Sequence, residues 1–226
     1  MLRSFKSNRD LMMKSIPYQY ICIEGNIGAG KTTLCEMLSE ELDCKLVLEQ
    51  FAENPFLPNF YKDPKRFAFP MELFLMAERY KQLQNHIHHR DLFSDYIISD
   101  YTFVKTLLFA KNNLPEEEYR LFHQMFEVLN EQIPKPDILV YLHRSLPNLM
   151  KQIALRGRPY EQKIETEYLM GLQHKYFDYF RNEVGFPILL IDVDNINFVE
   201  DKNYYNEIIR LMTEPLTPGL HRISLK

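Results

Sequence analysis

The chain has 226 residues, 46% of them hydrophobic and 26% charged, and carries a formal net charge of −4 at neutral pH. These values are ordinary for a globular domain and do not favour a nucleic-acid polymer or an anionic membrane surface as a partner. No apolar run approaches the roughly 18 residues that cross a bilayer. A phosphate-binding site must therefore depend on positive charge that is concentrated locally.

The amino-terminal segment is basic but lacks the apolar core of a signal peptide. We expect a flexible extension over residues 1–17 and one domain over residues 18–226. The cysteines Cys22, Cys35 and Cys44 have no CxxC spacing and lie in or beside apolar segments, which favours reduced packing thiols. These features predict a cytoplasmic protein.

Short apolar runs alternate with longer amphipathic segments along the whole chain. The runs typical of buried parallel strands cover residues 20–24, 45–49, 96–100, 137–142 and 187–193. The segments with helical spacing cover residues 32–42, 71–87, 102–111, 116–133, 146–155, 165–184 and 203–212. This alternation predicts an α/β fold with a five-stranded parallel sheet, helices on both faces, and ligands beyond the carboxyl ends of the strands.

A glycine-rich loop, GNIGAGKTT, follows the first predicted strand directly and opens the next helix. It contains the P-loop pattern GxxxxGK[ST], in which backbone N–H groups and a helix N-terminus bind the phosphates of a nucleotide. We expect its lysine to reach the β and γ phosphates of ATP and its first threonine to bind Mg²⁺. The predicted nucleotide-binding residues are Gly25, Asn26, Ile27, Gly28, Ala29, Gly30, Lys31, Thr32 and Thr33.

Carboxylates end the second and third predicted strands, at Glu49 and Asp100. Carboxylates beside a triphosphate are repelled unless they bind metal or accept a proton. One that holds Mg²⁺ and one that activates a hydroxyl would satisfy both conditions. Alternatively, each carboxylate caps the helix that follows it.

Arginines flank a glycine in the segment RGRPYE, between two predicted helices. Arg156 and Arg158 suit a mobile lid, at about residues 156–165, that closes on transferring phosphate oxygens. A solvated helix end is the alternative. Tyr61 precedes a proline-containing turn and could donate its hydroxyl to a ligand or only pack against its neighbours.

The segments EGNIGAGKTT, LVLEQFAENPFL, FYKDPKRFAF, ISDY and RGRPYEQKIETEYL resemble, in this order, the deoxynucleoside kinase family. The similarity extends from Tyr18 over nearly the whole chain and is strongest to the bacterial deoxyadenosine/deoxyguanosine kinase branch. The resemblance implies a P-loop kinase, usually dimeric, that transfers the γ-phosphate of ATP to the 5′-hydroxyl of a deoxynucleoside for nucleotide salvage.

The resemblance also assigns roles to single residues. Glu49 matches the family's general base, and Asp100 matches the acidic residue that helps to hold magnesium. Tyr61 and Glu161 match residues that bind the sugar 3′-hydroxyl. The predicted catalytic residues are Glu49, Lys31, Arg156 and Arg158.

The chain departs from the family at the residues that read the substrate. Tyr101, which we count among the substrate-binding residues, replaces the arginine that most members have, so the transition-state charge falls on Lys31 and the lid. Pro70, Ala77 and Thr106 align with the family's base-reading Gln, Arg and Asp. The resemblance to the deoxyadenosine/deoxyguanosine kinase branch favours a deoxypurine as the substrate. The residue that recognises the base is not determined. Glu72, Arg79, Lys105 or backbone groups could replace the family's base-reading residues.

Two other functions fit a P-loop chain of this length. A nucleoside-monophosphate kinase of thymidylate-kinase type would need no base but would need an arginine to bind the incoming monophosphate. A catalytically silent ATP-binding protein would need only the loop. Glu49 together with Tyr101 favours the nucleoside kinase.

Overall fold

A computed structural model describes residues 16–50, 54–87 and 95–225. The strands form one sheet in the order β2-β3-β1-β4-β5-β6, and every neighbouring pair is parallel. They are β1 (Tyr20–Gly25), β2 (Cys44–Val47), β3 (Tyr96–Ser99), β4 (Ile138–His143), β5 (Pro187–Asp192) and β6 (Gly219–Ser224). The predicted parallel α/β fold is confirmed, and the first five strands lie where the apolar runs placed them.

The predicted number of five strands was wrong, because β6 adds a sixth at one edge of the sheet. Its residues, GLHRIS, alternate between half-buried and exposed. An edge strand pairs on one side only, and one face of β6 is open, so the strand lacks the continuous apolar run of a buried parallel strand. That run was the signal that identified the other five.

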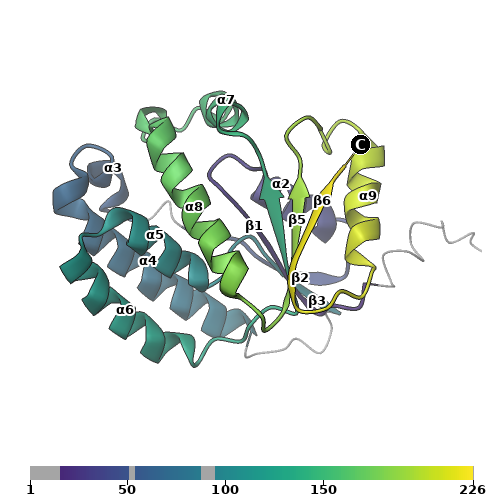
Figure 1. Cartoon of the computed structure of the whole chain (residues 1–226), viewed down its shortest axis with the longest axis horizontal. Coiled ribbons are helices and arrows are strands. Elements are labelled where there is room, and N and C mark those ends of the chain that lie inside the picture. The colour runs from purple at the N-terminus through teal and green to yellow at the C-terminus, as the bar shows by residue number, and fades with distance from the viewer. Residues whose placement is uncertain (1–15, 51–53, 88–94, 226) are drawn as a thin grey trace, which may run out of the picture.

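Helices flank both faces of the sheet (Figure 1). They are α2 (Lys31–Ser39), α3 (Leu57–Phe60), α4 (Pro64–Ile87), α5 (Val104–Asn113), α6 (Glu116–Asn130), α7 (Leu146–Arg156), α8 (Thr166–Asn182) and α9 (Lys202–Met212). The short 3₁₀ helix η1 (Glu161–Lys163) lies between α7 and α8. The structure contains each predicted helix, and α3 is an addition. No helix in the described part of the chain is long and apolar enough to cross a membrane.

The fourth strand shows how the sheet buries both of its faces. Ile138, Val140 and Leu142 belong to the core that packs with α2, α7 and α9. Leu139 and Tyr141 point to the other side and join the core with α5 and α8. Because successive side chains of a strand face opposite ways, this alternation requires helices on both faces and leaves only the strand ends for a ligand.

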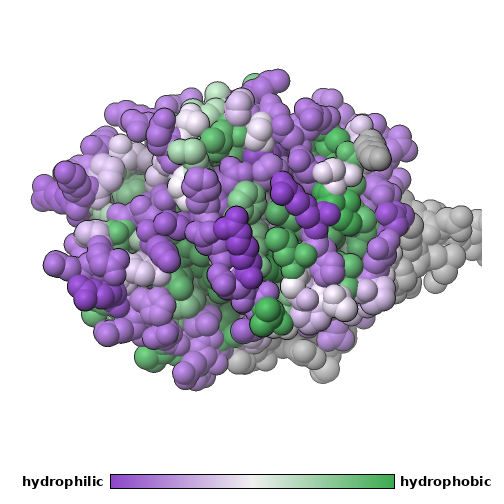
Figure 2. All heavy atoms as spheres, viewed as in Figure 1, coloured by the Kyte–Doolittle hydropathy of each residue, from purple (hydrophilic) through white to green (hydrophobic). Residues whose placement is uncertain are grey.

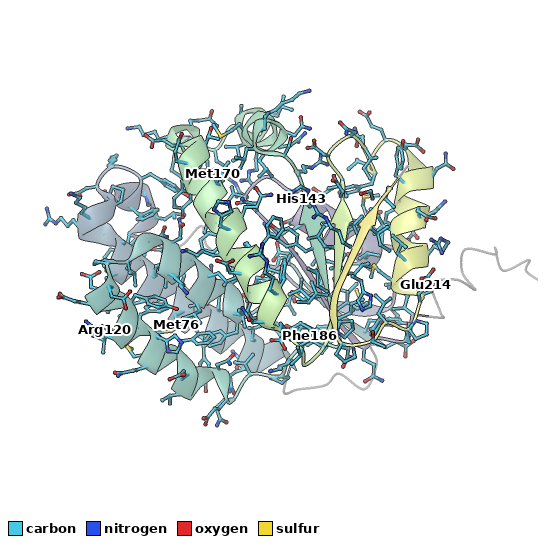
Figure 3. All side chains as sticks on the ribbon, in the orientation of Figure 1. Met76, Arg120, His143, Met170, Phe186 and Glu214 are labelled. Carbon is cyan, nitrogen blue, oxygen red and sulfur yellow. The ribbon has the colours of Figure 1, made fainter. Side chains whose placement is uncertain are left out.

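The two ends of the strands lie at opposite edges of the molecule. Figure 3 shows His143, the last residue of β4, toward the upper end of the sheet, and Phe186, just before β5, toward the lower end. Of the predicted extension over residues 1–17, residues 1–15 lie outside the described residues, whereas Ile16 is buried in the core. The loop between β1 and α2 lies at the carboxyl edge, as expected for a ligand site.

Candidate active site

The P-loop has a backbone conformation that only glycine adopts without strain. Gly28 has φ +85°, and a Cβ atom there would lie 3.0 Å from the carbonyl oxygen of Leu149 and 3.1 Å from Ile153 Cγ1. Gly30, at φ +98°, immediately precedes α2. The loop is therefore fitted closely against α7, with the unpaired N–H groups of the α2 N-terminus at its end.

Lys31 lies across this loop. Its Nζ donates to the carbonyl oxygens of Gly25, at 2.9 Å, and Asn26, at 3.0 Å. Burial, reinforced by the nearby charge of Lys105, lowers the pKa of Lys31 to about 8. An anion bound in the loop would favour the charged form of this lysine, so phosphate binding and protonation support each other.

Asp100 joins two of the predicted residues. Its Oδ2 accepts a hydrogen bond from the Thr32 hydroxyl at 2.6 Å, and its Oδ1 accepts from the backbone N–H of Glu49 at 2.7 Å. The strand-end argument thus brings Asp100 and Glu49 together, as expected. A hydroxyl and a carboxylate at the end of the P-loop are hard oxygen donors of the kind that Mg²⁺ prefers, so these residues fit that ion.

Glu49 lies between two buried cations. Its Oε1 is 2.6 Å from Arg79 Nη2, and its Oε2 accepts from Lys105 Nζ at 2.5 Å. Burial alone would raise the pKa of Glu49, but Lys105 and Arg79 outweigh it and hold this pKa well below its usual range. The glutamate is therefore ionised and fixed in direction. Sequence reasoning named both cations only as base readers and missed this ion pair.

The lid arginines bind a carboxylate of the lid itself. Arg156 donates from Nε at 3.0 Å and from Nη2 at 2.5 Å to Glu161 Oε2, and Arg158 donates from Nη1 to Oε1 at 3.2 Å. Tyr160 stacks on Tyr61, with 6.1 Å between the ring centroids. Arg156, Arg158, Glu161 and Tyr61 are therefore brought together by the fold.

One cavity at the carboxyl edge collects most of these side chains, and we call it the Glu49 cavity. Its polar lining includes Lys31, Thr32, Glu49, Tyr61, Arg79, Asp100, Lys105, Arg156, Arg158 and Glu161. Its apolar lining includes Ile27, Leu57, Met71, Leu75 and Phe109. The result is a slot with apolar walls and a charged end, the usual character of a small-molecule site.

A second cavity lies on the other side of the P-loop, and we call it the Arg144 cavity. Gly28, Ala29, Gly30 and Thr33 line it together with Arg144, Asn148 and the segment from Asp194 to Glu200. The P-loop therefore forms a wall of both cavities. A nucleotide held by its phosphates in the loop would face a second ligand in the Glu49 cavity.

Tyr101, predicted to bind substrate, is not part of the Glu49 cavity lining. Its ring is fully buried, and its hydroxyl donates to Gln82 Oε1 at 2.6 Å. The nearest replacement for the missing arginine is Lys105, one helical turn further on, which does line the cavity. A lysine five residues after the strand-end acid Asp100 was the available sequence signal.

Glu24, the residue before the P-loop, is a fully buried carboxylate that sequence reasoning did not single out. Its Oε2 accepts from the Tyr176 hydroxyl at 2.9 Å, and its Oε1 accepts from the backbone N–H of Thr102 at 2.9 Å. These bonds tie the end of β1 to α8 and to the segment after β3. Glu24 therefore supports the position of the loop.

A phosphate-binding loop between two cavities, with an ionised carboxylate in one of them, can hold a donor and an acceptor of a phosphoryl group at the same time. The fold and the site thus define a P-loop kinase.

The chain belongs to the deoxynucleoside kinase family, whose family model matches residues 21–217. It is 35% identical to the deoxyguanosine kinase of Bacillus subtilis over 84% of this chain and 93% of that protein. It is 32% identical to the deoxyadenosine kinase of Lactobacillus acidophilus over 88% of this chain and 96% of that protein. The resemblance inferred from the motifs is confirmed.

A solved structure gives the same result for the fold. The deoxyadenosine kinase from M. mycoides with bound dCTP superposes with a TM-score of 0.72 and 28% sequence identity. The match covers 84% of this chain and 98% of that one. The similarity therefore extends over most of the chain rather than over the P-loop alone.

Proposed function

We propose that this protein transfers the γ-phosphoryl group of ATP to the 5′-hydroxyl of a deoxynucleoside, with a deoxypurine preferred. The observation that carries the proposal is Glu49, an ionised carboxylate in the cavity that shares its wall with the P-loop. A neutral hydroxyl must lose its proton as it attacks phosphorus, and a carboxylate within reach accepts that proton. The names of the relatives, deoxyguanosine and deoxyadenosine kinase, support the choice of acceptor.

On this proposal the P-loop and the N-terminus of α2 bind the phosphates of the donor, and Lys31 leaves the loop carbonyls to contact them. The base and ribose of ATP would occupy the Arg144 cavity. Thr32 and Asp100 would hold Mg²⁺, which neutralises charge on the phosphate oxygens when it is bound.

The acceptor would occupy the Glu49 cavity. Arg79 and Lys105 fix both oxygens of Glu49, so the carboxylate is oriented before the substrate arrives. Arg156 and Arg158 would exchange Glu161 for the oxygens of the transferring phosphoryl group. The carboxylate of Glu161, released by this exchange, would then be available to the sugar 3′-hydroxyl together with Tyr61.

A phosphorylation screen tests the proposal. The purified protein is incubated with ATP, Mg²⁺ and each natural deoxynucleoside, ribonucleoside and nucleoside monophosphate, and the products are separated by chromatography. We expect deoxynucleoside 5′-monophosphates together with ADP, and no phosphorylation of the nucleoside monophosphates. Turnover of monophosphates alone would indicate the thymidylate-kinase type, whereas ATP binding without any transfer would indicate a silent binding protein.

We also propose that residues 18–226 act as one domain of a cytoplasmic homodimer. Figure 2 shows apolar residues gathered between α8 and β6, and the exposed large apolar side chains include Met170, Val184 and Leu220. Surfaces of this kind often bind a second protein chain. Cys22, Cys35 and Cys44 are free thiols, which supports a reducing compartment. Sedimentation equilibrium tests the dimer, and a monomer at micromolar concentration would contradict it.

A further inference from the structure

Glu72, on α4, has a buried carboxylate oxygen without a partner. Its side chain is fully buried, and its Oε1 accepts a hydrogen bond from Asn113 Nδ2 at 2.5 Å. Its Oε2 has no hydrogen-bond partner among the described residues. A buried carboxylate oxygen that lacks a donor costs free energy, so this atom points to a ligand that supplies one.

Glu72 is not itself part of the lining of the Glu49 cavity, but its neighbours are. Met71 and Leu75, its neighbours on α4, line the cavity, and so does Tyr168, whose hydroxyl accepts from Asn113 at 3.3 Å. Arg79 lies seven residues further along the same helix, or about 10 Å. Because Arg79 binds Glu49, this distance is on the scale of a nucleoside from its 5′-hydroxyl to the far edge of its base.

The other two side chains that could read the base are already bound elsewhere. Lys105 donates to Glu49 Oε2, and Arg79 binds Glu49 Oε1 and donates to Thr106 Oγ1 at 3.0 Å. Both therefore serve the end of the cavity at which the hydroxyl reacts. Of the three side chains, only Glu72 has an oxygen atom, Oε2, that can still accept a hydrogen bond from a ligand.

We propose that Glu72, held by Asn113, contacts the Watson–Crick edge of the purine base of the acceptor. The proposal rests on the proposed deoxynucleoside kinase activity and names the residue that determines its specificity. An ionised Glu72 accepts from the N1–H and amino group of guanine. A protonated Glu72 donates to N1 of adenine and accepts from its amino group. Each purine thus requires a different protonation state of one side chain.

Both states are accessible near neutral pH. Burial raises the pKa of Glu72 to about 7, against Arg79, Lys105 and the Asn113 hydrogen bond, which lower it, while Glu49 raises it further. The pKa of this carboxyl therefore lies near neutrality, well above that of an exposed glutamate.

The remaining groups that face Glu72 do not titrate in this range. Burial raises the pKa values of Tyr61, on the α3 side, and Tyr168, on α8, so both hydroxyls stay neutral. Lys31, whose pKa is about 8, would contact the phosphates of the donor that both reactions share, so its titration cancels in the ratio. A change in purine preference near neutral pH can then be assigned to Glu72. The pKa of Arg79 is raised and that of Glu49 is lowered, so the charges of these two groups remain constant there.

The test measures kcat/KM for deoxyguanosine and deoxyadenosine between about pH 6 and about pH 8. A group whose titration affects both substrates equally has no effect on the ratio of the two kcat/KM values. We expect the guanine-to-adenine ratio to rise with pH, by at most about tenfold per pH unit. A ratio that does not depend on pH in the wild-type protein would overturn the proposal.

Two variants on α4 sharpen the test. Glu72→Gln should abolish the pH dependence of the ratio and lower kcat/KM for deoxyguanosine by about 10- to 100-fold, the effect of losing a hydrogen bond to a charged group. Glu78→Gln, at a half-buried position of the same helix, should leave the ratio unchanged. An unchanged ratio in Glu72→Gln would refute the assignment.

Failure of the proposed kinase activity can be distinguished from failure of base recognition by Glu72. If neither nucleoside is phosphorylated at any pH, the kinase assignment fails, and the binding of both nucleosides is then measured by calorimetry over the same pH range. A binding ratio that follows pH in the wild-type protein, but not in Glu72→Gln, would still support base reading by Glu72. Equal binding at every pH would refute it. If Glu72→Gln does not fold, the wild-type ratio alone decides.

Discussion

Replacing Glu49 by Gln would remove the single negative charge between two buried cations. Lys105 lies 2.5 Å and Arg79 2.6 Å from its carboxylate, and the glutamate side chain is only 10% exposed. Loss of a general base lowers kcat by roughly 10²- to 10⁴-fold. Loss of one partner from a buried ion pair costs about 3–5 kcal/mol, because the remaining charges are uncompensated. We therefore expect both activity and stability to fall.

A double variant separates these two effects. Glu49→Gln combined with Lys105→Met removes one charge of each sign, so the cluster returns to its original net charge. We expect this protein to be more stable than Glu49→Gln alone, with a coupling free energy of about 0.5–3 kcal/mol, while kcat stays low. Glu78→Gln is the matched control for a Glu-to-Gln change.

The measurements are urea unfolding, kcat with a deoxynucleoside, and ATP affinity by calorimetry. ATP affinity should stay nearly intact in Glu49→Gln, because on the proposed function the phosphates would contact the P-loop and not this carboxylate. Full turnover in Glu49→Gln would refute the role of Glu49 as the base. A double variant no more stable than Glu49→Gln would refute the charge argument.

Three further changes test the surroundings of the site. Gly28→Ala forces a side chain into a conformation at φ +85°, which should cost about 1–3 kcal/mol and weaken ATP binding; an unchanged melting temperature and Kd would contradict this. Tyr176→Phe removes the 2.9 Å hydrogen bond to the buried carboxylate of Glu24, and urea unfolding should show a loss of about 1.5–3 kcal/mol. Arg156→Gln removes two donors to Glu161 and should lower kcat by roughly tenfold or more with little change in ATP affinity, so an unaltered kcat would exclude Arg156 from the transition state.

The parts of the fold that could be predicted are those that a local pattern specifies. Five strands have apolar runs because helices cover both of their faces, whereas β6 has one open face and an alternating pattern. Helix α4 begins at Pro64 and contains Pro70, rather than beginning at residue 71. A proline inside a helix removes one backbone hydrogen bond, so a sequence pattern places the helix start after it, and tertiary packing decides otherwise here.

The candidate site also has a part that the sequence predicts and a part that it does not. The P-loop is contiguous, and the ends of adjacent parallel strands must meet, so Glu49 and Asp100 could be placed together from their strands alone. Lys105 and Arg79 meet Glu49 across sequence separations of 56 and 30 residues. These contacts depend on how α4 and α5 are rotated about their axes, which spacing along the chain does not specify. Tyr101, which precedes α5, is buried in the core and does not line the cavity.

The position of the P-loop, as a shared wall of two cavities, has a kinetic and a pharmacological consequence. Both substrates must be bound before the phosphoryl group is transferred, so double-reciprocal plots of the initial rate should intersect. A mechanism with a phosphorylated enzyme intermediate would give parallel lines. A single molecule that links adenosine to a deoxynucleoside through a chain of phosphates would enter both cavities at once. Its second half would bind at an effective concentration in the millimolar range, about that of a short flexible linker, and the phosphate chain length would select this protein over kinases whose cavities lie further apart.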